Sequence, residues 1–361
     1  MKLVFIRTKI ESTVFWEAHP ANGFDQDTLE KMKISARAGS SSKNIIFGMH
    51  ERGWFKSFEE WKFWNGSEHE LNGASRFPVR LFPCDNDFTS AGMAAYVRRH
   101  GQPDILWVEG PDYPPYIDQI FDLCPESFKI VYSKDWRPHK IMKLERYNFC
   151  LVDEEWQAKK VKKHYPDVQC GIWDKLIDYE NTHYPIKSKK IYDICYIAYL
   201  RKRKNQELLI RAMAKLKERN LSCVFIGDDR KGYQAELEKL AANLGVSAYF
   251  AGEVSKEEVN RFVNKSKIGV ICARQDAVPR AILEYMAADV PVLVNADLQA
   301  GTRYVGPAAG LAKPPEEFHL GIAEMLDNLN RFSPRAYFLE HYSKDKTLTK
   351  FQAIIEQAGI R

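Results

Sequence analysis

Residues 268–294 constrain the fold of this chain more than any other stretch. An apolar run at 268–273 predicts a buried strand, a short polar loop follows, Pro279 opens a predicted helix, and an apolar run at 290–294 predicts a second strand. Proline suits the first helical turn, because the N–H that it lacks would have no partner there. Open α/β sheets bind ligands in loops at the carboxyl ends of such buried strands. The stretch therefore predicts an α/β protein with a binding loop before Pro279.

Two carboxylates bracket this loop. Asp276 lies within it and Glu284 lies about one turn inside the predicted helix, so both can point into one crevice. The free amides of a first helical turn attract an anion, and a buried carboxylate accepts hydrogen bonds from the hydroxyl groups of a sugar. The pattern predicts a site for a nucleotide sugar.

At these residues the sequence resembles the retaining GT-B glycosyltransferases of family 4, the glycogen-synthase-like group. Their signature is a Glu-x7-Glu motif followed by Ala-Met-Ala-x-Gly-x-Pro-Val. Asp276 takes the place of the first Glu, Glu284 takes the place of the second, and Tyr285 to Val292 follow in register. The resemblance is specific over residues 168–330 and only architectural before them.

The resemblance implies an α/β protein of the GT-B fold, in which two Rossmann-like, doubly wound domains face each other across a cleft. It implies a retaining glycosyltransferase that moves a sugar from a nucleotide diphosphate sugar to a glycan or lipid-linked acceptor, in surface polysaccharide synthesis and without a metal or other cofactor. Two alternatives stay open. One is a sugar-nucleotide epimerase or hydrolase on the same scaffold, and the other is a non-catalytic protein that binds a nucleotide sugar.

Length, charge and cysteine content agree with these expectations. The 361 residues suit two domains of ordinary size. The net charge of +5 is spread along the chain, which fits anionic ligands or a membrane surface and does not favour a nucleic-acid-binding protein. The seven cysteines include no Cys-x-x-Cys pair, as is typical of the reducing cytosol. No run approaches the roughly 20 apolar residues of a membrane span, so we expect a cytoplasmic protein. If it associates peripherally with a membrane, we expect it at the inner face.

Alternating strand and helix signals divide the chain. We expect an amino-terminal, acceptor-side domain at 1–175, a linker at 176–190, a nucleotide-sugar domain at 191–343, and a last helix within 344–361 that crosses back to the first domain, as the resemblance implies. The strands expected in the first domain are 2–7, 44–49, 78–82, 104–108, 129–133 and 149–152, and the helices are 27–37, 87–99, 114–123 and 154–164. The Trp-rich stretch 54–64 fits neither pattern, and an acceptor-side loop is one interpretation of it.

A basic loop follows the first predicted strand of the second domain. The family has Gly-Arg-Leu-x-x-x-Lys-Gly here, with the Arg and the Lys on the diphosphate. Lys204 aligns with this Lys, Tyr199 stands in place of the Arg, and Arg201 and Arg203 lie in the same loop. The resemblance thus implies that Lys204 acts on the leaving group and that the two arginines bind the donor. The alternative is a solvated basic loop.

The resemblance also implies the other donor contacts. Asp276 is expected to act at the donor sugar, with helix capping as the alternative, and Glu284 is expected to hold the ribose, with solvent exposure as the alternative. The further residues expected around the diphosphate and the base are Ala277, Val278, Arg280, Gly252, Glu253, Val254 and Gly227. Solvent exposure is the alternative for Arg280, and a plain turn at the end of a strand is the alternative for 252–254. Because Ala277 and Pro279 replace two loop glycines of the family, we expect the backbone to approach the diphosphate less closely.

The acceptor side rests on residues after strands of the first domain. The family often carries a His after the strand predicted at 129–133, where this chain has Lys134 and then Asp135. These two are therefore the expected catalytic residues of this side, and His139 is the candidate to replace the missing His. Glu109 and Arg7, at the ends of two other predicted strands, complete the acceptor side.

One short motif suggests a metal. Asp85-Asn86-Asp87 matches the Asp-x-Asp that binds Mn²⁺ in the other large glycosyltransferase fold, but it precedes a predicted helix, so capping is the better interpretation. The nine histidines show no HxxxH or HExxH spacing. We predict no metal site.

Overall fold

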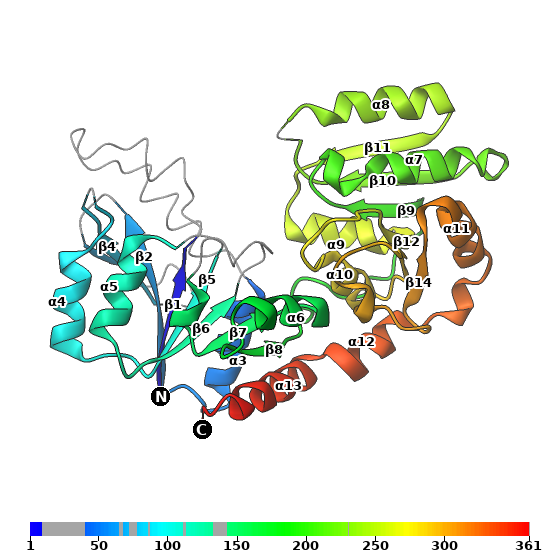
Figure 1. Ribbon diagram of the computed structural model, residues 1–361. Helices are drawn as coiled ribbons and strands as arrows, with labels where there is room; N and C mark the ends of the chain where they lie inside the picture. Colours follow the sequence, from blue (N-terminus) through cyan, green and yellow to red (C-terminus); the bar gives the residue numbers. More distant parts are fainter. Residues whose placement is uncertain are drawn as a thin grey trace. The chain divides into compact units, whose positions relative to one another are not determined.

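The computed structural model describes residues 1–8, 40–64, 68–71, 78–85, 87–110, 113–132, 143–229 and 231–360. The chain divides into two compact units. Unit 1 comprises Met1–Asp174 and Leu348–Arg361, and unit 2 comprises Lys175–Thr347. Each unit is built on its own largely parallel sheet with helices packed against it (Figure 1).

Unit 1 contains, among the residues described, an eight-stranded sheet in the order β3-β4-β2-β1-β5-β6-β7-β8. The strands are β1 (Lys2–Arg7), β2 (Ser57–Trp64), β3 (His69–Leu71), β4 (Val79–Pro83), β5 (Ile105–Glu109), β6 (Phe128–Tyr132), β7 (Phe149–Val152) and β8 (Gln169–Ile172). The short β3 pairs antiparallel with β4, whereas β1 is parallel to both of its neighbours. The strand order reverses between β1 and β5, and doubly wound sheets bind ligands at the carboxyl ends of the strands at such a point.

The helices of unit 1 are α3 (Ser41–Glu51), α4 (Ala91–His100), α5 (Pro115–Leu123) and α6 (Glu155–His164), and the final helix α13 (Lys344–Gln357) packs against α3. A Cβ atom added at Gly48 of α3 would lie 2.6 Å from Leu348 Cδ1 of α13. The rings of Phe351 and Trp107 are stacked, with centroids 5.4 Å apart. The carboxy-terminal residues therefore form part of the core of unit 1, as the red helix beside α3 in Figure 1 illustrates.

The strand expected at 44–49 is wrong, because these residues lie in α3. Ser40 caps this helix by accepting a hydrogen bond from the Lys43 N–H at 3.2 Å. Ile45, Ile46 and Met49 are buried at the spacing of one helical face. The apolar run looked like a strand because it is short, and the cap was the signal that distinguishes a helix.

The loop considered for 54–64 is also wrong, because Ser57–Trp64 is the buried strand β2. Its charged members disguise the strand pattern. Glu60 is fully buried, with Oε2 at 2.6 Å from the Lys43 ammonium. A charge that is paired inside the protein carries no sequence signal that distinguishes it from an exposed one.

Unit 2 contains a six-stranded parallel sheet in the order β11-β10-β9-β12-β13-β14 among the residues described. Its strands are β9 (Tyr192–Ile197), β10 (Ser222–Ile226), β11 (Ser247–Gly252), β12 (Ser266–Ile271), β13 (Val292–Asn295) and β14 (Gly310–Lys313). Its helices are α7 (Gln206–Ala214), α8 (Tyr233–Leu244), α9 (Lys256–Asn264), α10 (Ala281–Ala287), α11 (Phe318–Asp327) and α12 (Pro334–Tyr342). Numbered along the chain, this is the 3-2-1-4-5-6 order of nucleotide-binding sheets, which reverses between β9 and β12.

Residues 176–190, expected as a linker, lie within unit 2. The Ile186 N–H donates to Asn264 Oδ1 at 2.6 Å, and the Lys190 ammonium donates to the Ser266 carbonyl at 2.8 Å. The polar residues of this segment thus bond to α9 and β12. In the part of the chain that is described, no helix is both long and apolar enough to cross a membrane.

Candidate functional site

Two loops lie where the strand order of unit 2 reverses. One follows β9 at residues 198–205, and the other follows β12 at residues 272–280. A sheet of this topology binds its ligand in the crevice outside the carboxyl ends of these two strands. Lys204 and Asp276, the residues predicted to act on the donor, are in these loops.

Lys204 and Asp276 are in direct contact. The ammonium of the lysine forms an ion pair with the carboxylate of the aspartate, and only 13% and 10% of the two side chains is exposed. A buried pair of this kind adds little to stability, because removing two charges from water costs about as much as their attraction returns. Its effect is to hold a positive charge at a fixed place between the two loops.

The backbone at Lys204 is held from both sides. The Tyr196 hydroxyl donates to the Lys204 carbonyl at 2.5 Å, and the side-chain amide of Asn205 donates to the Cys272 carbonyl at 3.4 Å. Asn205 has a φ of 56°, a left-handed conformation that asparagine tolerates better than most residues. These bonds connect the loop after β9 to the end of β12.

Arg201 is a second cation in this loop, and the residues described give it no ion pair. Its Nε atom is buried without a hydrogen-bond partner, and its guanidinium lies over the Tyr199 ring at 5.6 Å from the centroid. Tyr199, which replaces the family's Arg, therefore forms a cation–π contact with Arg201. An unpaired buried N–H costs about 1–3 kcal/mol, so this group is suited to bind a ligand. Arg203 is exposed and makes no such contact among the described residues.

Glu284 has a buried neighbour that sequence reasoning missed. His183 Nε2 lies 3.7 Å from Glu284 Oε1, and both residues belong to unit 2. Burial lowers the pKa of His183, although the carboxylate of Glu284 acts in the opposite direction. The ring is therefore neutral near pH 7 and leaves the negative charge of Glu284 uncompensated. No spacing pattern marks His183, because its position depends on how residues 175–190 pack.

The helix that carries Glu284 is fixed by its neighbour Tyr285. The Tyr285 hydroxyl accepts a hydrogen bond from the Ile197 N–H at 2.8 Å and donates to the Cys195 carbonyl at 3.1 Å. The ring fits because residue 269 is a glycine: a Cβ atom there would lie 2.4 Å from Tyr285 Cγ. The interaction aligns α10 with the end of β9, where Lys204 follows.

We expect Tyr285→Phe to lower the free energy of unfolding by about 1–3 kcal/mol, because the Ile197 N–H and the Cys195 carbonyl lose a buried partner. Urea unfolding followed by circular dichroism measures this change. Tyr249→Phe is the matched control, because half of Tyr249 is exposed, and we expect a change within about 0.5 kcal/mol. Equal stabilities of the two variants would contradict this role of Tyr285.

The helix predicted to begin at Pro279 begins at Ala281. The Ile282 N–H nevertheless bonds to the Pro279 carbonyl at 3.1 Å, so the proline stands in the turn that leads into α10. Of the donor contacts predicted around this turn, Val278 is buried, Ala277 is half-buried and Arg280 is exposed.

The predicted contacts at Gly227 and Gly252 lie in one turn region. The Gly227 N–H donates to the Gly252 carbonyl at 2.9 Å. The φ angles of the two glycines are 149° and 70°. A Cβ atom at Gly227 would lie 2.2 Å from the Ala198 carbonyl oxygen, so this glycine lets the turn after β10 approach the turn after β9. Next to Gly252, Glu253 is exposed and Val254 is half-buried.

On the acceptor side, Arg7 and Glu109 lie at the carboxyl ends of β1 and β5 and are paired in register. The structure therefore brings together two of the five residues predicted for unit 1. Lys134, Asp135 and His139 lie outside the described residues.

The Asp85 carboxylate organises a turn. It accepts hydrogen bonds from the Thr89 N–H at 2.8 Å and from the Thr89 hydroxyl at 2.6 Å, whereas Asn86 lies outside the described residues. Among the residues described, no group of three or more His, Cys, Asp or Glu is placed to hold a metal ion.

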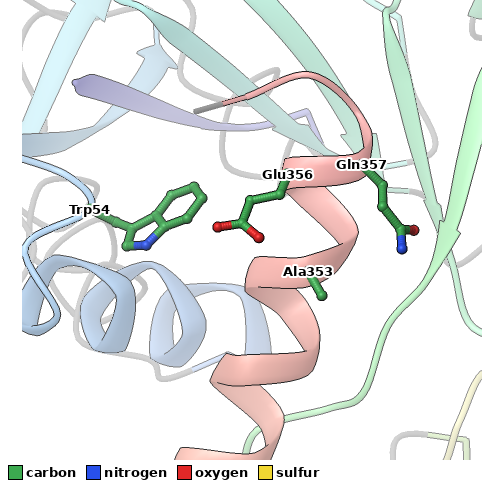
Figure 2. A pocket seen from close by; sticks show the side chains of 4 residues that line it. All are labelled: Trp54, Ala353, Glu356 and Gln357. Carbon is green, nitrogen blue, oxygen red and sulfur yellow. The ribbon is translucent and has the colours of Figure 1, made fainter.

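A hollow of about 550 Å³ lies beside α13 in unit 1 (Figure 2). The described residues that line it are Trp54, Ala353, Glu356 and Gln357. The Glu356 carboxylate already accepts a hydrogen bond from the Gln352 amide at 3.0 Å. None of these four lining residues was predicted for the donor or acceptor site.

Two doubly wound α/β units in one chain, with charged loops where the second sheet reverses its order, define a protein of the GT-B fold. Residues 180–337 match the family described as glycosyl transferases group 1. Family and fold together make the chain a glycosyltransferase.

Solved structures with a similar fold cover nearly all of the chain. The apo form of the lipopolysaccharide outer core galactosyltransferase WaaB has a TM-score of 0.69 at 13% identity, over 99% of each chain. Sucrose-phosphate synthase from Thermosynechococcus elongatus has a TM-score of 0.68 at 11% identity, over 99% of this chain and 98% of that chain. Anabaena HepE in complex with UDP and glucose has a TM-score of 0.67 at 13% identity, over 99% of each chain. Comparison with curated proteins finds no match.

Proposed function

We propose that the chain is a retaining glycosyltransferase that moves a sugar from a nucleotide diphosphate sugar to a hydroxyl group of a glycan or lipid-linked acceptor, in surface polysaccharide synthesis. The observation that carries this proposal is the buried Lys204–Asp276 pair beside the unpaired Arg201, where the sheet of a group 1 domain reverses. The complex of HepE with UDP and glucose supports the donor class, and WaaB supports a surface glycan as acceptor.

The chemical task is to stabilise the diphosphate that departs from the sugar. Lys204 and Arg201 supply positive charge at a fixed place, in a site where burial strengthens electrostatic interactions. When the diphosphate binds, it replaces Asp276 as the partner of the ammonium. The released Asp276 carboxylate then accepts hydrogen bonds from the sugar hydroxyls. No metal ion is needed in this scheme, since the two side chains provide the charge.

Glu284 is the residue that we assign to the ribose. Burial lowers the pKa of His183, which lies 3.7 Å from it, so the neutral ring does not compensate this carboxylate near pH 7. Glu284 is therefore able to accept hydrogen bonds from both hydroxyl groups of the ribose.

Glu284→Ala is expected to weaken nucleotide binding by about 10- to 150-fold, the equivalent of the roughly 1.5–3 kcal/mol of a charge-assisted hydrogen bond. Isothermal titration of the full chain with a nucleoside diphosphate measures the affinity. Glu257→Ala, in the exposed first turn of α9, is the control and should bind as the unmodified chain does. Unchanged affinity in Glu284→Ala would remove this residue from the site.

The proposal is tested first by a thermal-shift screen of UDP-, GDP- and ADP-sugars. A ligand at 100 times its dissociation constant stabilises by about 2.7 kcal/mol. CMP-sugars, which carry one phosphate, are the matched controls. The bound donor is then incubated with and without acceptor glycans. Release of nucleotide that depends on the acceptor, with retained anomeric configuration by NMR, supports the transferase. Turnover without an acceptor would instead indicate an epimerase or hydrolase, and binding without turnover would indicate a non-catalytic protein.

We place this reaction in the cytoplasm, with the acceptor presented at the inner face of the membrane. All seven cysteines are free, which suits a reducing compartment.

A further inference from the structure

Unit 1 has its own point of strand reversal, between β1 and β5, and a helix begins beside it. Arg7 ends β1 and is paired in register with Glu109 at the end of β5. The Ser42 hydroxyl at the start of α3 donates to the Glu109 carboxylate, and the Thr8 N–H donates to the Glu109 carbonyl at 2.8 Å. Glu109 therefore brings the end of β1 and the amino terminus of α3 to one place.

Within the part of the chain that is described, three polar groups at this place are buried without a hydrogen-bond partner: Arg7 Nε, Thr8 Oγ1 and Ser41 Oγ. Thr8 is fully buried and Ser41 is 7% exposed, so these side chains are shielded from bulk water. Within the described residues the Arg7 guanidinium has no hydrogen bond or ion pair, and it lies 5.9 Å from the centroid of the Phe5 ring. Orphaned polar groups are rare inside proteins, and three of them in one place indicate a ligand.

The charges at this place favour an anion. The Lys43 ammonium forms an ion pair with Glu60 Oε2 at 2.6 Å, and Lys62 Nζ lies 3.9 Å from Glu60 Oε1. Burial lowers the pKa of Lys43 and the positive charge of Arg7 acts in the same direction, while Glu60 and Glu109 oppose them. Among the described residues, Arg7, Lys43 and Lys62 thus lie near the carboxylates of Glu60 and Glu109, and Ser42 donates a hydrogen bond to that of Glu109. The excess positive charge is that of Arg7.

The amino terminus of α3 adds to this preference. The helix has 11 residues and no acidic residue in its first turn. The Lys43 N–H is capped by Ser40, and the other N–H groups of the first turn and the dipole of the helix favour an anion. A guanidinium with two hydroxyl groups matches the tetrahedral oxygens of a phosphate.

We propose that Arg7, Thr8, Ser41 and the amino terminus of α3 bind a phosphate group carried by the acceptor. The assignment to the acceptor rests on the proposed function, whereas the phosphate site itself does not. The donor diphosphate is assigned elsewhere, because Lys204 and Arg201 of unit 2 supply its positive charge. The enzyme would then prefer a phosphorylated sugar or a phosphate-linked lipid to the same hydroxyl acceptor without phosphate.

Isothermal titration of the full chain with a hexose 6-phosphate, with inorganic phosphate and with UDP tests the proposal. We expect Arg7→Gln and Ser41→Ala to weaken binding of the two monophosphates by about tenfold or more, as the loss of one hydrogen bond to a charged group does, and to leave UDP binding unchanged. Arg7→Lys should retain part of the affinity. Arg99→Gln, an exposed residue at the end of α4, is the control and should bind as the unmodified chain does.

Stability separates a ligand contact from a structural one. Because the Ser41 hydroxyl has no partner, Ser41→Ala should leave the unfolding midpoint unchanged while it weakens phosphate binding. Two results would overturn the acceptor-phosphate site and leave the proposed function intact. One is that the monophosphates bind Arg7→Gln and Ser41→Ala as tightly as they bind the unmodified chain. The other is that Lys204→Ala, instead of these variants, abolishes monophosphate binding. Failure of UDP to bind while the monophosphates bind through Arg7 would count against the donor site and for a phosphate site at β1.

Discussion

Lys204→Ala is expected to lower the rate of sugar transfer by about 10²- to 10³-fold, which is the effect of removing one preorganised group that stabilises developing charge. The ammonium is buried beside Asp276 and would contact the departing diphosphate. Initial rates of nucleotide release under saturating donor and acceptor measure the loss. Lys202→Ala is the matched control, because the Lys202 side chain is 75% exposed and pairs with Glu236 on the surface. We expect it to retain full activity.

A loss of activity in Lys204→Ala also has a structural explanation, since the variant leaves the Asp276 carboxylate buried without its partner. Breaking a buried pair costs about 3–5 kcal/mol, whereas replacing both members with apolar residues is often neutral. The double variant Lys204→Met/Asp276→Leu should therefore regain stability in urea but not activity. Full activity in either variant would contradict the role assigned to Lys204.

Gly227→Ala is expected to lower the free energy of unfolding by about 3 kcal/mol. A Cβ atom there would lie 2.2 Å from the carbonyl oxygen of Ala198, which is backbone and has no rotamer to change. The φ of 149° adds strain of its own. Because Ala198 begins the loop that leads to Lys204, donor affinity should fall as well. Urea unfolding and titration with the donor measure the two effects.

Gly245→Ala provides the comparison for Gly227→Ala. Gly245 has a φ of 66°, but a Cβ atom there meets nothing within 4 Å. The Gly245→Ala substitution should therefore lower the free energy of unfolding by about 1 kcal/mol, because alanine is disfavoured in a left-handed conformation. If both alanine variants lost the same stability, the close approach at Gly227 would not be the reason for its glycine.

The donor half of the site could be predicted from the sequence because it depends on patterns of neighbouring residues. Each loop follows a strand whose residues form a continuous apolar run, and such runs reveal buried parallel strands without knowledge of their partners. Lys204 and Asp276 follow two strands that are neighbours in the sheet, and the structure brings them into contact. The Ser-x-x-Glu spacing of Ser255 and Glu258 is a local signal of the same kind, and both hydrogen bonds of this capping box are present at the start of α9.

The parts that sequence reasoning missed depend on contacts between distant residues. Glu60 made β2 look polar, because its partner Lys43 lies in another element. His183 lay in a stretch that looked like a linker, and its proximity to Glu284 arises only when residues 175–190 pack on unit 2. Arg7 could be placed at the end of a strand, but nothing in the sequence showed that its guanidinium would lack a partner. Pairing and burial of single charges have no periodicity to detect.

The central claim is that a nucleotide diphosphate sugar binds where the sheet of unit 2 reverses its order, and amide hydrogen exchange of the full chain with and without the donor tests it most directly. We predict slower exchange at residues 198–205 and 273–284, with the protection reduced in Glu284→Ala. A donor that binds by titration yet leaves exchange in both loops unchanged, and slows it elsewhere, would contradict the claim.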